Sequence, residues 1–80
     1  MALRPAVKKA VQKARRKLGK RLRALRESRK LTQEQASELI GVHPYHLRRI
    51  EAGTQSATLT FLVAASIGFR VRLPRLFEAE

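Results

Sequence analysis

Residues 31–53 read LTQEQASELIGVHPYHLRRIEAG, and this stretch contains the signals that start and stop two short helices. Thr32 and Gln35 stand three residues apart, the spacing of a capping box in which each side chain satisfies a free backbone donor at a helix start. Gly41 supplies the left-handed turn that commonly ends a helix. The pattern therefore predicts a helix over 33–40 that ends in a tight turn.

A second helix follows that turn almost at once. Pro44 suits the first helical turn, where its missing N–H leaves no intrahelical bond unmade. Gly53 closes the segment after the last apolar residue. The sequence therefore predicts a second helix over 44–52, and two short helices joined by a glycine turn are typical of a DNA-reading helix-turn-helix.

Length and composition favour a single small binding domain. A chain of 80 residues buries only about 60% of the surface that its unfolded form exposes, which leaves little room for a deep catalytic cleft. The absence of cysteine excludes disulfides and thiolate metal sites and favours a cytoplasmic location. The longest mostly apolar run, over 61–69, is shorter than the roughly 20 residues that span a bilayer, so we expect no membrane segment.

The positive charge belongs to one part of the chain. Residues 1–30 hold 13 Lys and Arg against one acid, whereas residues 31–80 hold five of each sign. A concentrated cationic face releases counterions from a polyanion, so nucleic acid is the expected partner. An anionic membrane surface and a merely solvated helix face are the alternatives.

Apolar residues from Val7 to Leu25 recur at helical spacings, which predicts an amphipathic helix reaching about residue 30. Gly19 interrupts this pattern and weakens helix, so we place a boundary there. The predicted domains are a basic N-terminal extension over 1–18 and a DNA-binding domain over 19–78, whose first helix spans about 19–30.

A fourth helix is predicted after a loop over 54–57. Thr58 can cap it, and a single buried stripe is expected from Leu59, Leu62, Val63, Ala65 and Phe69. The end of the chain has two interpretations. Residues 69–73 alternate strictly and suit a strand, whereas 73–77 suit a short helix with proline in its first turn, which we favour.

Residues 18–77 resemble the Cro/Xre-type (phage-repressor) helix-turn-helix family without a gap. The resemblance rests on Gly19, Leu22, Arg26, residues 31–34, Gly41, Val42, Leu47, Ile50, Glu51, Gly53, Leu59, Leu62, Leu76 and Phe77. It implies an all-α, compact five-helix repressor-like bundle, here with a helical basic extension, which usually binds operator DNA as a symmetric dimer. It implies no chemistry, and we expect no enzyme.

Recognition is expected from the second helix of the motif. Helical spacing assigns Leu47 and Ile50 to the core and leaves the polar residues on faces open to solvent or DNA. Arginine donates two hydrogen bonds to guanine, and tyrosine can contact a thymine methyl or a phosphate. The predicted base-reading residues, including one implied by the family alone, are Pro44, Tyr45, His46, Arg48 and Arg49.

Phosphate contacts are expected around this helix and from the basic segment. A side-chain amide beside free backbone donors at a helix start can hold a phosphate oxygen, as the matching family position does. The predicted phosphate-binding residues are Gln33, His43, Thr54, Gln55, Lys13, Arg15, Arg16, Lys17 and Lys20.

The resemblance also implies structural roles. Arg26 and Glu51 match a partly buried ion pair, and the expected dimer interface contains Leu73, Leu76 and Phe77. His43 replaces the usual capping serine or threonine, and Arg70 replaces the usual glycine after the fourth helix, so looser capping is expected.

No cofactor or metal is expected. His43 and His46 lie three apart, but no convincing third ligand lies nearby, and no nucleophile has a recognisable base beside it.

The sequence predicts a transcriptional regulator, most simply a repressor, that binds double-stranded DNA as a homodimer. One alternative is an antitoxin that also holds a protein toxin through residues 69–80. Another is a non-specific nucleic-acid-binding or scaffolding protein, in which the bundle only supports the cationic helix.

Overall fold

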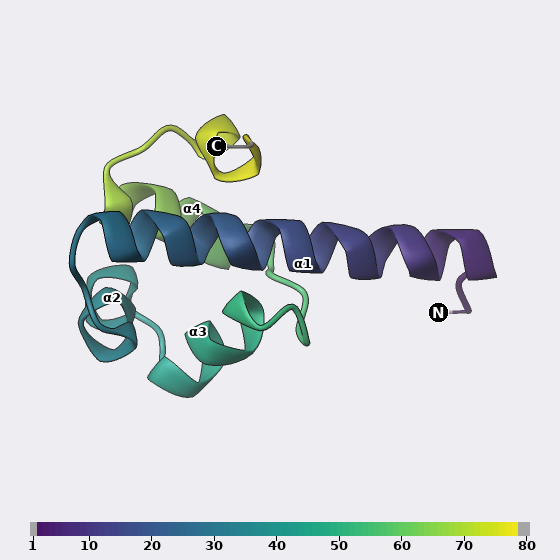
Figure 1. Cartoon of the computed structure of the whole chain (residues 1–80), viewed down its shortest axis with the longest axis horizontal. Helices are drawn as coiled ribbons and strands as arrows, with labels where there is room; N and C mark the ends of the chain where they lie inside the picture. The colour runs from purple at the N-terminus through teal and green to yellow at the C-terminus, as the bar shows by residue number, and fades with distance from the viewer. Residues whose placement is uncertain (1, 79–80) are drawn as a thin grey trace.

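The computed structural model describes residues 2–78, which contain four α-helices and one short 3₁₀-helix (Figure 1). In chain order these elements are α1 (Pro5–Ser28), α2 (Gln33–Ile40), α3 (Pro44–Glu51), α4 (Leu59–Phe69) and the 3₁₀-helix η1 (Leu73–Phe77). The described residues include no strand. The all-helical prediction is therefore confirmed, whereas the count of five α-helices is not, because the fifth element is a 3₁₀ turn.

The glycine turn and its capping box form as the sequence predicts. Thr32 Oγ1 accepts from the backbone N–H of Gln35 at 3.1 Å, and Gln35 Oε1 accepts from the backbone N–H of Thr32 at 2.9 Å. Gly41 then takes a left-handed conformation with φ of 87°. Local chemistry alone thus sets both ends of α2.

The helix α3 is capped more completely than expected. The Nδ1 atom of His43 accepts from the backbone N–H of Tyr45 at 3.1 Å, so the imidazole takes the place of a capping hydroxyl. Gly53 follows the helix with φ of 77°. The expectation of a looser start to α3 is wrong, because a ring nitrogen can accept this hydrogen bond as an oxygen would.

The predicted boundary at Gly19 is wrong at the level of secondary structure, because α1 runs through it as one 24-residue helix. Gly19 is buried, and a Cβ atom there would lie 2.4 Å from the carbonyl oxygen of Glu51 and 2.6 Å from that of Ile50. Glycine is needed for the close approach of α1 to the end of α3. The division into segments 1–18 and 19–78 remains a prediction of function only.

The chain after α4 forms the favoured short helix. Phe69 still belongs to α4, and Arg70 ends it in a left-handed conformation with φ of 57°. The backbone N–H of Val71 then donates to Ser66 O at 3.0 Å, a 6→1 closure typical of helix ends. These hydrogen bonds use backbone N–H groups that a strand over 69–73 would need for pairing. Residues 69–73 therefore do not form the alternative strand.

The buried face of α4 agrees only in part with the predicted stripe, since Ala65 and Phe69 are buried as expected. Phe61, Ala65, Ser66 and Phe69 are buried, whereas Leu59 is 70% exposed and Val63 is 41% exposed. The helix is apolar almost all round, so periodicity could not decide which side faces the core. Phe61 is buried instead, and its ring stacks on His46 of α3.

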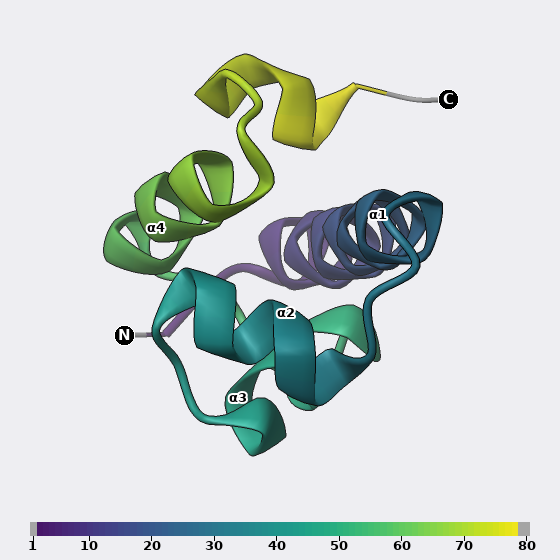
Figure 2. The same cartoon turned by 90° about the vertical axis from the view of Figure 1, so that its left-hand side faces the viewer.

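The core lies between three layers of helix. In both views, α1 and α4 lie between η1 on one side and α2 with α3 on the other (Figures 1 and 2). Every helix except α2 contributes to the largest fully buried apolar side chains, which are Phe69, Leu22, Leu47, Ile50 and Leu76. The first turns of α1 extend beyond the other helices (Figure 1).

The close approach at Gly19 predicts the sign of the change in stability when this residue is replaced by alanine. On helix propensity alone, Gly19→Ala should stabilise an exposed helix by about 1 kcal/mol. Because the methyl group would meet two backbone carbonyls, we expect it instead to lower the free energy of unfolding by about 1–3 kcal/mol. Urea denaturation of both proteins measures this difference, and a stabilised variant would contradict the close packing of α1 on α3.

Candidate nucleic-acid interface

The outer face of α3 is a polar surface on a firmly anchored helix. Leu47 and Ile50 have 0% and 1% of their surface exposed and fix the helix to the core. Tyr45 is 53% exposed, and Arg48 is also exposed. The predicted core positions Leu47 and Ile50 are therefore confirmed, whereas His46 and Arg49 are half-buried rather than open to solvent.

Tyr45 and Arg49 form a pair one helical turn apart. Arg49 Nη1 donates to the Tyr45 hydroxyl at 2.9 Å, and the guanidinium carbon lies 5.5 Å from the centre of the tyrosine ring. Arg49 Nε is buried, and within residues 2–78 it has no hydrogen-bond partner. The pair therefore holds Arg49 in place along the helix, with one guanidinium nitrogen bonded to Tyr45 and another buried without an acceptor.

His46 is fixed from two sides. Its ring stacks on Phe61, with 5.8 Å between ring centres and 13° between planes. Its Nε2 atom lies 3.1 Å from Gln55 Nε2. Thr54 donates its hydroxyl proton to Arg49 O at 3.1 Å. The structure thus joins two predicted phosphate-binding residues of the loop to the predicted reading helix.

The carboxylate of Glu51 connects three helices. It accepts from Arg26 Nε at 2.7 Å, from Arg26 Nη2 at 3.0 Å and from Gln33 Nε2 at 3.1 Å. Only 13% of the arginine side chain and 4% of the glutamate side chain are exposed. The hydrogen bond to Glu51 raises the pKa of Arg26, although burial opposes this rise. Arg26 also donates to Leu31 O at 2.9 Å, which ties down the start of the motif.

A small cleft of about 390 Å³ opens beside this network. Gln33 at the start of α2 lines it together with Arg23 of α1 and Arg48 of α3. Arg23 and Arg48, from two different helices, therefore line the same cleft as the predicted phosphate-binding glutamine. Sequence reasoning had not connected Arg23 with this place, because only the fold brings α1 beside α3.

The basic residues of α1 divide into two groups. Arg15 donates from Nε to Ser56 Oγ at 2.7 Å, and a Cβ on Gly53 would lie 3.0 Å from the Arg16 side chain. These two residues thus pack against the loop after α3. The other predicted phosphate-binding lysines of this segment are all exposed: Lys13, Lys17 and Lys20.

The residues predicted for a dimer interface do not share one environment. Leu76 has 0% of its surface exposed and belongs to the core, so its side chain does not reach a second chain in this fold. Phe77 is 58% exposed and Leu73 is partly buried. Sequence reasoning missed an exposed apolar stripe on α4, made of Leu59, Val63 and Ile67. Their spacing of four residues was the available signal.

Residues 17–72 match the model of a helix-turn-helix domain. This chain belongs to the helix-turn-helix domain family. The match covers the turn, the capping box and α3, and the resemblance to Cro/Xre-type proteins is confirmed. The family and the fold are those of DNA-binding regulators.

Two solved structures have the same fold. The restriction-modification controller protein C.AhdI from Aeromonas hydrophila is 27% identical, with a TM-score of 0.77 over 79% of this chain and 96% of that chain. An HTH_3 family transcriptional regulator from Vibrio cholerae is 27% identical, with a TM-score of 0.80 over 84% of this chain. The matched part is only 38% of that second chain. Among curated proteins, no relative matches significantly.

Two further observations concern residues 2–78. None of the helices there is both long and apolar enough to cross a membrane. That part of the chain also brings together no three His, Asp or Glu side chains in a metal-binding arrangement. The Nδ1 atom of His43 is used in capping α3, and His46 is stacked on Phe61.

The network around Glu51 makes a prediction about stability. Glu51→Ala would leave Arg26 buried without its counterion, so we expect it to lower the free energy of unfolding by about 3–5 kcal/mol. Glu38→Ala on the exposed face of α2 is the control and should leave stability nearly unchanged. Equal losses of stability in the two variants, measured by urea denaturation, would show that the carboxylate does not hold the three helices together.

Proposed function

We propose that this chain is a sequence-specific transcriptional regulator, a repressor, that binds an inverted-repeat operator as a homodimer. The observation that carries this proposal is the Tyr45–Arg49 pair, an exposed tyrosine bonded to a half-buried arginine, on a helix whose opposite face is fully buried. A reading helix must present donors at a fixed place, since side chains that are ordered before binding lose less entropy on the DNA.

Base recognition is assigned to α3 in the major groove. Arg49 would donate to guanine through the guanidinium atoms that Tyr45 leaves free, and Arg48 would do so from the neighbouring exposed face. Pro44 and His46 complete the surface, with His46 kept in place by Phe61 and Gln55.

Phosphate binding is assigned to both ends of the motif. The cleft at Gln33 is lined by three arginines, Arg23, Arg26 and Arg48, against the single carboxylate of Glu51, and this excess of positive charge supports an anion there. The other proposed contacts come from the start of α3, the following loop and α1: His43, Thr54, Gln55, Lys13, Arg15, Arg16, Lys17 and Lys20. These contacts would add affinity that does not depend on sequence.

The homodimer is assigned to the outer side of α4. Leu59 is 70% exposed, Val63 41% and Ile67 72%, and successive fourth residues lie on one helix face. A contiguous apolar stripe on a small protein is typical of an interaction surface. Leu73 would extend this interface, whereas Leu76 is buried in the core and Phe77 lines a groove against α1. A symmetric pair would place its two α3 helices about 34–36 Å apart on successive major grooves.

Selection of bound sequences from a random DNA pool tests this function. The salt concentration should be about 0.15 M, so that loose electrostatic attraction is screened. We expect enrichment of an inverted repeat, because two symmetric subunits read two half-sites. Tight binding without any enriched sequence would instead favour a non-specific nucleic-acid-binding or scaffolding protein.

Arg49 should contribute mainly to specificity. We expect Arg49→Ala to reduce discrimination between the selected operator and random DNA by about 1–3 kcal/mol, because alanine cannot donate the two hydrogen bonds that read a guanine. Fluorescence anisotropy with both DNAs measures this ratio. Arg72→Ala, at an exposed position outside α3, is the control. An unchanged specificity ratio in the Arg49 variant would remove this residue from the reading surface.

The lysines of α1 should contribute mainly to affinity. Lys13→Gln combined with Lys20→Gln removes two exposed charges, so we expect weaker binding to every DNA sequence. The slope of log K against log salt should become shallower by about 0.9 for each phosphate that the variant no longer neutralises. A slope equal to that of the unaltered protein would show that these two lysines lie away from the DNA.

A further inference from the structure

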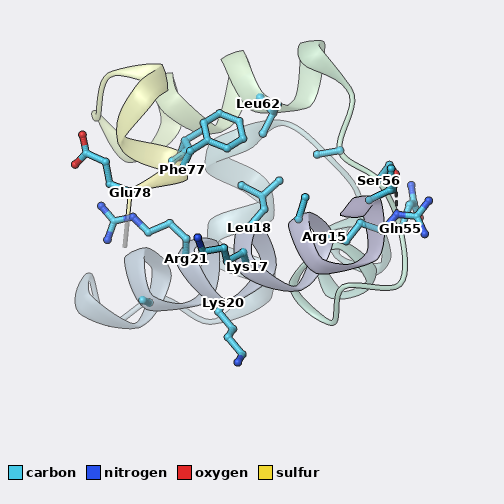
Figure 3. Close-up of a pocket in the computed structure, with 15 residues that line it drawn as sticks. Arg15, Lys17, Leu18, Lys20, Arg21, Gln55, Ser56, Leu62, Phe77 and Glu78 are labelled. Atoms are coloured by element: carbon cyan, nitrogen blue, oxygen red, sulfur yellow. Dashed lines mark hydrogen bonds between the residues drawn. The ribbon is translucent and has the colours of Figure 1, made fainter. Parts of the chain in front are cut away.

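An apolar groove of about 590 Å³ runs along α1, and its walls are formed by η1, by α4 and by the loop before α4 (Figure 3). Leu18 lies across from Leu62 and Phe77 in this close-up. Val11 and Ala14 continue the floor toward the N-terminus, and more than half of the Phe77 surface is exposed. The groove is therefore an open trough with an apolar floor.

The groove lies on the opposite side of α1 from the proposed DNA-reading helix. Gly19 and Arg26 face α3, since a Cβ on Gly19 would meet the end of α3 and Arg26 pairs with Glu51. Leu18 and Arg21 line the groove instead. A molecule in the groove would therefore leave α3 accessible.

The apolar floor continues along the projecting part of α1. Val7, Val11, Ala14 and Leu18 follow one another at spacings of four, three and four, which places them on one helix face. Figure 1 shows these first turns extending beyond the other helices. From Val7 to Ala24, at about 1.5 Å of rise per residue, the surface is about 25 Å long. That length matches a partner helix of about 17 residues rather than a small ligand.

Charge around the groove indicates the chemistry of its partner. Arg15, Lys17, Lys20 and Arg21 line it against the single acid Glu78. Arg15 and Arg21 are also bonded within the fold, to Ser56 Oγ and to Arg75 O. A second copy of the strongly basic α1 would be repelled, and DNA would not cover the apolar floor. A flat lipid surface would be held away from Leu18 by the walls of η1 and α4.

We propose that the groove, with the apolar stripe leading into it, binds an acidic amphipathic α-helix of a partner protein. Apolar side chains of that helix would fill the trough at positions i, i+3, i+4 and i+7, and its carboxylates would face the basic rim. This surface would give the protein a second binding partner at a site distinct from α3, although Arg15, Lys17 and Lys20 are shared between its basic rim and the proposed phosphate contacts.

The test uses a designed helical peptide of about 18 residues, with leucine at positions i, i+3, i+4 and i+7 and glutamate on both flanks. Fluorescence anisotropy of the labelled peptide should show saturable binding to the full chain. Amide NMR shifts should concentrate on Leu18, Leu62 and Phe77. A scrambled peptide of the same composition is the control and should not saturate.

Two matched pairs of variants locate the site. Lys17→Glu should weaken peptide binding about fivefold or more through the rim charge, whereas Lys9→Glu, on α1 outside the groove, should change it less than about twofold. Phe77→Ala should weaken binding about tenfold. Leu39→Ala removes a similarly exposed side chain from α2 and should have little effect.

Several outcomes overturn the proposal. They are equal binding of the scrambled peptide, shifts confined to helices outside the groove, or no saturation at about millimolar peptide. A larger change in the amide NMR signal of Phe77 with anionic vesicles than with the peptide would assign the surface to lipid. The assay contains no DNA, so its failure leaves the proposed regulator untouched.

Discussion

The fold depends on one buried carboxylate. Glu51 ends α3, and its two oxygens accept hydrogen bonds from Arg26 of α1 and Gln33 of α2. A buried charge is costly unless it is fully paired, so the three helices have to meet in one arrangement to satisfy it. The same contact places the start of α2 beside the end of α3, which forms the cleft proposed for phosphate. One interaction therefore fixes both the orientation of α3 and the position of the cleft proposed for phosphate.

The close approach at Gly19 reinforces this arrangement from the backbone side. Without a side chain, α1 reaches the carbonyl oxygens of Ile50 and Glu51, and the guanidinium of Arg26 can then meet the carboxylate. One side of α1 therefore packs against α3. The other side is left with an apolar stripe and basic flanks, of which η1 and α4 cover only a part. A single helix consequently contributes to the core, to the proposed DNA backbone contacts and to the proposed docking groove, and the last two share Arg15, Lys17 and Lys20.

Local signals in the sequence were reliable wherever the backbone near a residue decides its conformation. Three features each depend only on residues at most four positions away in the chain. They are the capping box at Thr32, the left-handed turn at Gly41 and the start of α3 at Pro44. The burial of Leu47 and Ile50 also followed from spacing alone, because α3 has charges on its other faces. The candidate reading residues could therefore be selected before the fold was known.

The misassigned features share a physical cause, which is that they depend on groups far away in the chain. Gly19 looked like a helix breaker, but its role is set by the carbonyls of Ile50 and Glu51, on a different helix. The face of α4 was assigned correctly only at Ala65 and Phe69, because apolar residues surround that helix, and packing against the other helices buried Phe61 rather than Leu59. The ends of the motif helices and the position of the charge could be read from neighbouring residues. Which apolar faces are covered and which stay open depends on the surfaces that the other helices present, and these exist only in the folded chain.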